Sequence, residues 1–132
     1  MKELIGKTII RIEVSPGEEY IKFTHPDGSY TAYQAYGDCC SETWFADIVG
    51  VEALLRANVL EIREVDLQSY DCKDDRTRQE YDEFYGVKIK TSKGYSDIIY
   101  RNSSNGYYGG SISLYTGKFP NNMLEITSDW SA

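Results

Sequence analysis

Three strand-like runs follow one another in TIIRIEVSPGEEYIKFTHPDGSYTAYQAY (residues 8–36), the stretch that decides the fold class. In Thr8–Val14 and in Glu19–His25, apolar and polar residues alternate, as they do in a strand with one buried face. Ser29–Tyr36 follows as a third strand. SPGE and HPDG separate the runs, and Pro and Gly in such short stretches are typical of tight turns. Short turns between successive strands predict an antiparallel meander.

The period of the sequence changes after the third run. In GDCCSETWFADIVGVEALLRA (residues 37–57), apolar residues such as Trp44, Phe45 and Ile48 recur at three- and four-residue spacing. This spacing predicts a helix, and Ser41 is a suitable cap for its first turn. Gly50 breaks the segment. We therefore expect one or two short helices after the third strand.

The remaining sequence returns to strand patterns. Residues 66–83 are strongly charged and carry little apolar patterning, so they are interpreted as a long loop. Further strands are predicted at Asn58–Leu67, Phe84–Thr91, Tyr95–Arg101, Tyr107–Tyr115 and Asn122–Thr127. The expected fold is a single α+β domain over residues 1–132, with a predominantly antiparallel sheet of about eight strands.

Composition and charge exclude several classes of function. The chain has 132 residues with 41% hydrophobic content, enough for one buried core, and a formal net charge of −7. An acidic chain is poorly suited to duplex DNA or to an anionic membrane, because both bind basic surfaces. No apolar run approaches the roughly 20 residues of a membrane span, and the N-terminus has no secretory signal pattern. An odd number of cysteines, three, is not a disulfide framework, so a cytoplasmic location is expected.

The sequence offers little for catalysis or for metal binding. His25 is the single histidine and has no second ligand at metal-binding spacing, while Cys39 and Cys40 are adjacent rather than spaced. A Cys–His dyad between these residues stays open, because such partners can meet in space. The favoured interpretation makes the cysteines small apolar residues. We expect no enzyme activity, no cofactor and no metal.

The segment RNSSNGYYGGS (residues 101–111) has two interpretations. Asn-Gly is the preferred pair of a two-residue hairpin turn, which explains Asn105 and Gly106. Two tyrosines followed by two glycines are not explained in this way, because paired glycines weaken a strand and mark a close approach of backbone or ligand. A binding loop would offer Arg101 to a phosphate, tyrosine rings to a base, and asparagine amides to a ribose. Both interpretations remain open at this point.

Two segments together resemble a known family. They are YGDCCSETWFADIVGVEALL (residues 36–55) and SSNGYY (residues 103–108). Their combination and the strand order around them resemble the Thoeris anti-defence sponge family, first type. The resemblance implies a phage protein of the host cytoplasm that sequesters cyclic ADP-ribose isomers, such as glyco-cyclic ADP-ribose, without degrading them. It also implies homodimers that build into hexamers, and cyclic oligonucleotides as further ligands.

The resemblance carries a ligand-contact role only to the hairpin motif, that is, to Arg101, Asn102, Asn105, Tyr107 and Tyr108. Chemistry alone adds two candidates. Arg56 would clamp a phosphate and Phe84 would stack on a base. The alternative function is an acidic protein–protein inhibitor that blocks the basic surface of a host defence nuclease.

Overall fold

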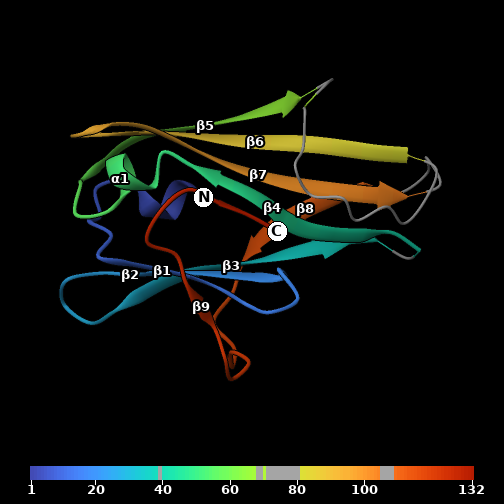
Figure 1. Cartoon of the computed structure of the whole chain (residues 1–132), viewed down its shortest axis with the longest axis horizontal. Helices are drawn as coiled ribbons and strands as arrows, with labels where there is room; N and C mark the ends of the chain where they lie inside the picture. The colour runs from blue at the N-terminus through green and yellow to red at the C-terminus, as the bar shows by residue number, and fades with distance from the viewer. Residues whose placement is uncertain (39, 68–69, 71–80, 105–108) are drawn as a thin grey trace.

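Two stacked antiparallel sheets make up the fold, as Figure 1 shows for the computed structural model. The structure describes residues 1–38, 40–67, 70, 81–104 and 109–132. Within these residues the helical elements are the 3-10 helix η1 (Lys2–Leu4) and the helix α1 (Val51–Leu54). The strands are β1 (Arg11–Val14), β2 (Tyr20–Thr24), β3 (Tyr30–Gly37), β4 (Glu42–Val49), β5 (Val59–Leu67), β6 (Tyr81–Thr91), β7 (Gly94–Ser104), β8 (Gly110–Leu114), β9 (Leu124–Glu125) and β10 (Trp130–Ser131).

The order of the strands separates the chain into two layers. The first sheet has the order β8-β3-β2-β1-β9, and the second has the order β10-β4-β7-β6-β5. Neighbouring strands pair antiparallel throughout the described part of the chain, so the predicted antiparallel character is confirmed. The strand count exceeds the predicted eight, because β4 lies in the segment predicted as helix and β10 lies outside every predicted strand.

The meander predicted from residues 8–36 is present as β1, β2 and β3. Alternate residues of β1 and β2 are buried, among them Ile12 and Phe23. The first strand is shorter than predicted, because Thr8 and Ile9 form only isolated bridges to Asn58 and Leu55. Alternation along the sequence located these strands correctly because each strand of the meander has one face toward the core.

The helix expected over residues 37–57 is largely wrong. Glu42–Val49 forms strand β4, and only Val51–Leu54 is helical. Trp44 and Ile48, together with the residues between them, are buried, so both faces of β4 are covered. A strand buried on both faces has a continuous apolar run, and such a run cannot be distinguished from a helix by periodicity alone. A bulge between Phe45 and Asp47 disturbs the two-residue alternation further.

The C-terminal segment joins the two layers. β9 pairs with β1 in the first sheet, and β10 pairs with β4 in the second. Between them, Ile126 is 3% exposed and donates its backbone N–H to the Ile12 carbonyl over 2.8 Å. The tail therefore closes one side of a core built mainly from Ile, Val and Phe of both sheets.

The loop predicted over residues 66–83 is shorter in the structure than the sequence suggests. β5 continues through Leu67 and β6 already begins at Tyr81, so both ends of the predicted loop are strand. Tyr70 is described within it. The rest of the predicted loop, and the predicted Asn105–Gly106 turn, lie outside the described residues.

Two glycines allow the sheets to approach each other at one end. Gly37 of β3 and Gly110 of β8 are direct register partners. A Cβ atom on Gly110 would lie 2.9 Å from the Asn102 amide nitrogen and closer still to the Thr43 hydroxyl oxygen. A Cβ atom on Gly37 would lie 2.6 Å from the Ser41 hydroxyl oxygen. Gly110, the second glycine of the YYGG motif, thus has a packing role, because no side chain fits at this position.

We predict that Gly110→Ala lowers the free energy of unfolding by about 1–3 kcal/mol, since the new methyl group overpacks the Thr43 and Asn102 contact. Urea unfolding followed by circular dichroism measures the change. Gly17→Ala is the control, because nothing lies within 4 Å of a Cβ atom at that position. Equal stability of the Gly110 variant and the parent would contradict the packing role.

Each sheet has a buried tyrosine that packs in the core, Tyr33 in β3 and Tyr100 in β7. Tyr33 is 2% exposed and donates its hydroxyl to Glu3 Oε1 over 2.8 Å. Burial, followed by that hydrogen bond, raises the pKa of Tyr33 well above its usual range. Burial, followed by the charges of Glu64 and Asp66, raises the pKa of Tyr100 to about 12. Folding therefore favours the neutral phenol at both positions.

Alkaline pH should destabilise the fold for this reason. Below about pH 10 both tyrosines are neutral in the folded and unfolded states, so they add no pH dependence. Between about pH 10 and 12 the unfolded chain loses phenol protons that the folded chain retains, and stability falls as pH rises. Urea unfolding at pH 8, 10 and 11 measures the slope, which Tyr33→Phe should reduce. An unchanged slope in this variant would contradict the assignment.

Candidate functional site

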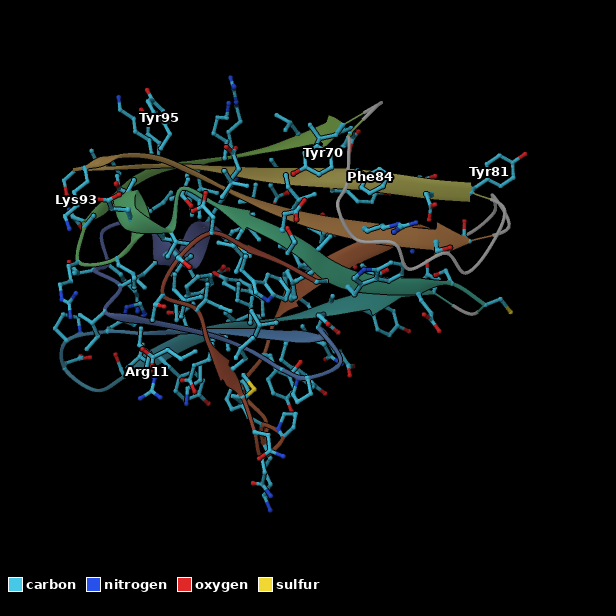
Figure 2. All side chains as sticks on the ribbon, in the orientation of Figure 1. Arg11, Tyr70, Tyr81, Phe84, Lys93 and Tyr95 are labelled. Carbon is cyan, nitrogen blue, oxygen red and sulfur yellow. The ribbon has the colours of Figure 1, made fainter. Side chains whose placement is uncertain are left out.

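The outer face of the second sheet carries the candidate site. Strand pairing aligns Trp44 of β4, Arg101 of β7, Phe84 of β6 and Leu67 of β5 in one row across the sheet. Their side chains share a face because directly paired residues of neighbouring strands point to the same side. The row lies at the end of the sheet where β6 begins, near the labels of Phe84 and Tyr70 in Figure 2. It brings two aromatic rings next to one cation.

Arg101 is the centre of this row. Its guanidinium carbon lies 5.1 Å from the centroid of the Trp44 ring and 5.4 Å from that of Phe84. Nε and Nη2 donate to the two carboxylate oxygens of Asp82 over 3.1 and 2.7 Å. The Arg101 side chain is only 5% exposed, whereas that of Asp82 is 28% exposed. A two-point ion pair flanked by aromatic rings fixes the orientation of the guanidinium plane.

Tyr70 lies against the same row. Its ring centroid is 5.8 Å from that of Phe84, and its hydroxyl donates to Asp47 Oδ2 over 2.7 Å. Asp47 is 3% exposed, and its other carboxylate oxygen has no hydrogen-bond partner among the residues that the structure describes. We call this group the Arg101 cluster; its members are Trp44, Asp47, Tyr70, Asp82, Phe84 and Arg101.

The structure separates two residues that the sequence placed in one motif. Asn102 follows Arg101 on β7, so it points to the opposite face, into the space between the sheets. It is fully buried, and its amide donates to the Thr43 hydroxyl over 2.9 Å and to the Glu42 carbonyl over 3.3 Å. Asn102 Oδ1 has no partner within the described part of the chain. A single ligand molecule on the outer face cannot contact the Asn102 side chain.

The other predicted contact residues divide between two places. Phe84 is brought next to Arg101, as described above. Asn105, Tyr107 and Tyr108 lie outside the described residues. Arg56 follows α1, at the opposite end of the second sheet (Figure 1). It is exposed and lines a separate hollow of about 580 Å³ together with Lys93 and Asp129.

Sequence reasoning missed four members of the Arg101 cluster, namely Trp44, Asp47, Tyr70 and Asp82. The sequence pattern places Trp44 and Asp47 in the predicted helix, and Tyr70 and Asp82 in the predicted loop. A strand interpretation beginning at Tyr81 would have found one of them, because Asp82 and Phe84 are two residues apart and share a face. Pairing across strands, which links Trp44 to Arg101, leaves no signal in a single sequence.

The histidine and cysteines considered above for a catalytic dyad lie in different environments. His25 is buried, with Nδ1 2.7 Å from the Thr8 carbonyl oxygen and Nε2 2.7 Å from the Thr31 hydroxyl oxygen. Cys40 is exposed, and Cys39 lies outside the described residues. In the described ranges, no three His, Cys, Asp or Glu side chains are grouped so that they could hold a metal ion. Those ranges also contain no helix long and apolar enough to cross a membrane.

The cluster can recognise a ligand that is both planar and anionic. The guanidinium offers hydrogen bonds to a phosphate or carboxylate, and the Phe84 and Tyr70 rings offer surfaces for a planar group. Asp82 is hydrogen-bonded to the guanidinium, so an anionic ligand must displace this carboxylate.

Asp82 and Arg101 should be strongly coupled. We predict a coupling free energy of about 1.5–3 kcal/mol in a double-mutant cycle of Asp82→Ala and Arg101→Ala, because the ion pair is bidentate and its side chains are mostly buried. Urea unfolding of the four proteins measures it. The more exposed pair of Arg11 and Glu125 is the control and should couple by less than about 1 kcal/mol. Similar values for both pairs would contradict a special role for Asp82.

Comparison with known proteins places the chain in a family. Residues 2–114 match the family described as a domain of unknown function, DUF7448. The match ends at the last residue of β8, so the tail with β9 and β10 lies beyond it. No curated protein and no solved structure matches the chain significantly. The chain belongs to the DUF7448 family.

Proposed function

We propose that this protein is a phage-type anti-defence protein that binds a cyclic ADP-ribose isomer and holds it intact. The motif resemblance is the source of the ligand class. The observation that carries the proposal is the Arg101 guanidinium between the Trp44 and Phe84 rings. A cation held between aromatic rings suits a ligand that combines a diphosphate with an adenine base.

The ligand would use the Arg101 cluster as follows. A phosphate would take over guanidinium donors from Asp82, which is the more exposed partner of the pair. The adenine would stack on the Phe84 ring, whose centroid lies 5.8 Å from that of the Tyr70 ring. Binding of this kind needs no bond to be broken.

The predicted hairpin contacts keep a place in this proposal. Asn105, Tyr107 and Tyr108 directly follow β7, which carries Arg101, and we propose that they contact the same ligand. Asn102 supports the site from below by fixing β7 against Thr43 of β4. Arg56 and Arg101 lie at opposite ends of one copy, so both would contact one ligand only at an interface between two copies. A homodimer, and hexamers built from it, are therefore part of the proposal.

Titration calorimetry with a cyclic ADP-ribose isomer tests the proposal. We expect tight binding by the parent and an affinity about 10- to 100-fold weaker for Arg101→Ala, because charge-assisted hydrogen bonds are lost. Arg11→Ala, which changes an exposed arginine of the other sheet, should bind like the parent. Asp82→Asn should bind more tightly, because the Asp82 charge no longer competes with the ligand for the guanidinium. This variant also separates a lost contact from a damaged fold.

Recovery of the ligand distinguishes storage from turnover. Heat denaturation of the complex should release the isomer unchanged, as judged by chromatography. Release of a cleaved product would contradict sequestration, and absence of binding by the parent would overturn the proposal. A salt-sensitive complex with a basic defence nuclease, without nucleotide binding, would favour the alternative of an acidic protein–protein inhibitor.

A further inference from the structure

A second hollow lies on the inner face of the second sheet, opposite the face of the Arg101 cluster. It has a volume of about 130 Å³ and is lined by Glu64, Val65, Asp66, Tyr85, Gly86 and Tyr100. Strand register places Asp66 of β5 opposite Tyr85 of β6, and Tyr85 opposite Tyr100 of β7. Glu64 precedes Asp66 by two residues and shares its face. We call the group of Glu64, Asp66, Glu83, Tyr85 and Tyr100 the tyrosine notch.

Two stacked phenol rings form the aromatic part of the notch. The ring centroids of Tyr85 and Tyr100 are 4.9 Å apart, and the ring planes differ by 19°. The Tyr85 hydroxyl donates to the Glu83 carboxylate. Tyr100 is only 7% exposed, yet its hydroxyl has no hydrogen-bond partner among the described residues. The hydroxyl oxygen is not one of the buried unpaired atoms of the described residues, so it reaches the hollow and can accept a hydrogen bond from a ligand there.

Carboxylates surround these rings. Glu64 and Asp66 are both exposed at the mouth of the notch, and Glu83 accepts the hydrogen bond from the Tyr85 hydroxyl. The Met1 ammonium lies 3.6 Å from Glu64 Oε1, whereas Asp66 forms no ion pair in the part of the chain that the structure describes. The Glu64 and Asp66 charges contribute to the raised pKa of Tyr100, which places both close to its phenol. The notch is therefore a locally negative site with an uncompensated carboxylate.

We propose that the tyrosine notch binds an organic cation, namely a primary ammonium or guanidinium group. Such a group would donate hydrogen bonds to Asp66 and to the Tyr100 hydroxyl oxygen, and it would lie against rings whose faces attract cations. The volume suits one such head group with a short alkyl stem. The same chemistry can come from a small amine or from a lysine or arginine side chain of another protein. The notch is on the opposite face from the Arg101 cluster, so its occupancy is independent of nucleotide binding.

Titration with butylguanidinium, followed by ¹H–¹⁵N correlation spectra, tests this inference. We expect saturable shifts of the amides of β5 to β7 around Asp66, Tyr85 and Tyr100. Butylurea, which has nearly the same shape without the charge, should cause none. Binding should weaken at high salt, because the ion pair lies at the mouth of the notch and is screened.

Variants show whether the named groups hold the cation. Asp66→Asn should weaken binding about tenfold or more, and Tyr100→Phe about fivefold, since each removes one partner of a cation. Glu61→Gln is the matched control, because it removes the same charge from the outer face of the same strand. Equal weakening by Glu61→Gln, or equal shifts with butylurea, would overturn the inference. So would an absence of saturable binding by the parent.

A peptide identifies the source of the cation. If acetyl-Gly-Arg-Gly-amide binds with the same Asp66 dependence, the notch accepts an arginine side chain of a protein partner. If only butylguanidinium binds, the notch accepts a small free cation. Nucleotide binding by Asp66→Asn should equal that of the parent, which keeps failure of this inference distinct from failure of the proposed function.

Discussion

The pleat of β7 is the constraint on which both sites depend. β7 pairs with β4 on one side and with β6 on the other, and successive residues point to opposite faces of the sheet. Tyr100 and Asn102 therefore face the space between the sheets, while Arg101 faces outward between Trp44 and Phe84. A change of one residue in register would exchange these environments. The strong pairing of β7 on both sides prevents such a change.

Small residues hold this strand in place at one end. Gly37 and Gly110 of the first sheet carry no side chains of their own, and Gly110 thereby leaves room for the Thr43 and Asn102 side chains of the second sheet. Asn102 is hydrogen-bonded to Thr43 of the neighbouring strand β4 and is fully buried. A motif that has the composition of a binding loop thus contains residues that secure the sheets. Its arginine lies instead on the outer face, between the buried Trp44 ring and the half-buried Phe84 ring.

The charges on the two faces of the second sheet are arranged differently. On the outer face a mostly buried guanidinium is balanced by Asp82, and on the inner face carboxylates surround two phenols. A net charge of −7 describes neither site, because charge acts locally in partly buried positions. The acidic composition argued against duplex DNA and anionic membranes, but it did not indicate where a cation would be attracted. That location follows from the strand register that puts Asp66 beside Tyr85.

The sequence by itself determined the elements with one buried face. β1 and β2 follow from alternation and from the turn residues between them, because each period of two maps directly onto a face. It also predicted Arg101 and Phe84 as ligand contacts, and the structure brings these two side chains together. Only the tertiary structure decided that residues 42–49 form a strand, since both faces are covered and the apolar pattern loses its period. It alone brought Trp44, Asp82 and Tyr70 to Arg101 and separated Asn102 and Arg56 from it, because cross-strand neighbours are set by pairing between distant segments.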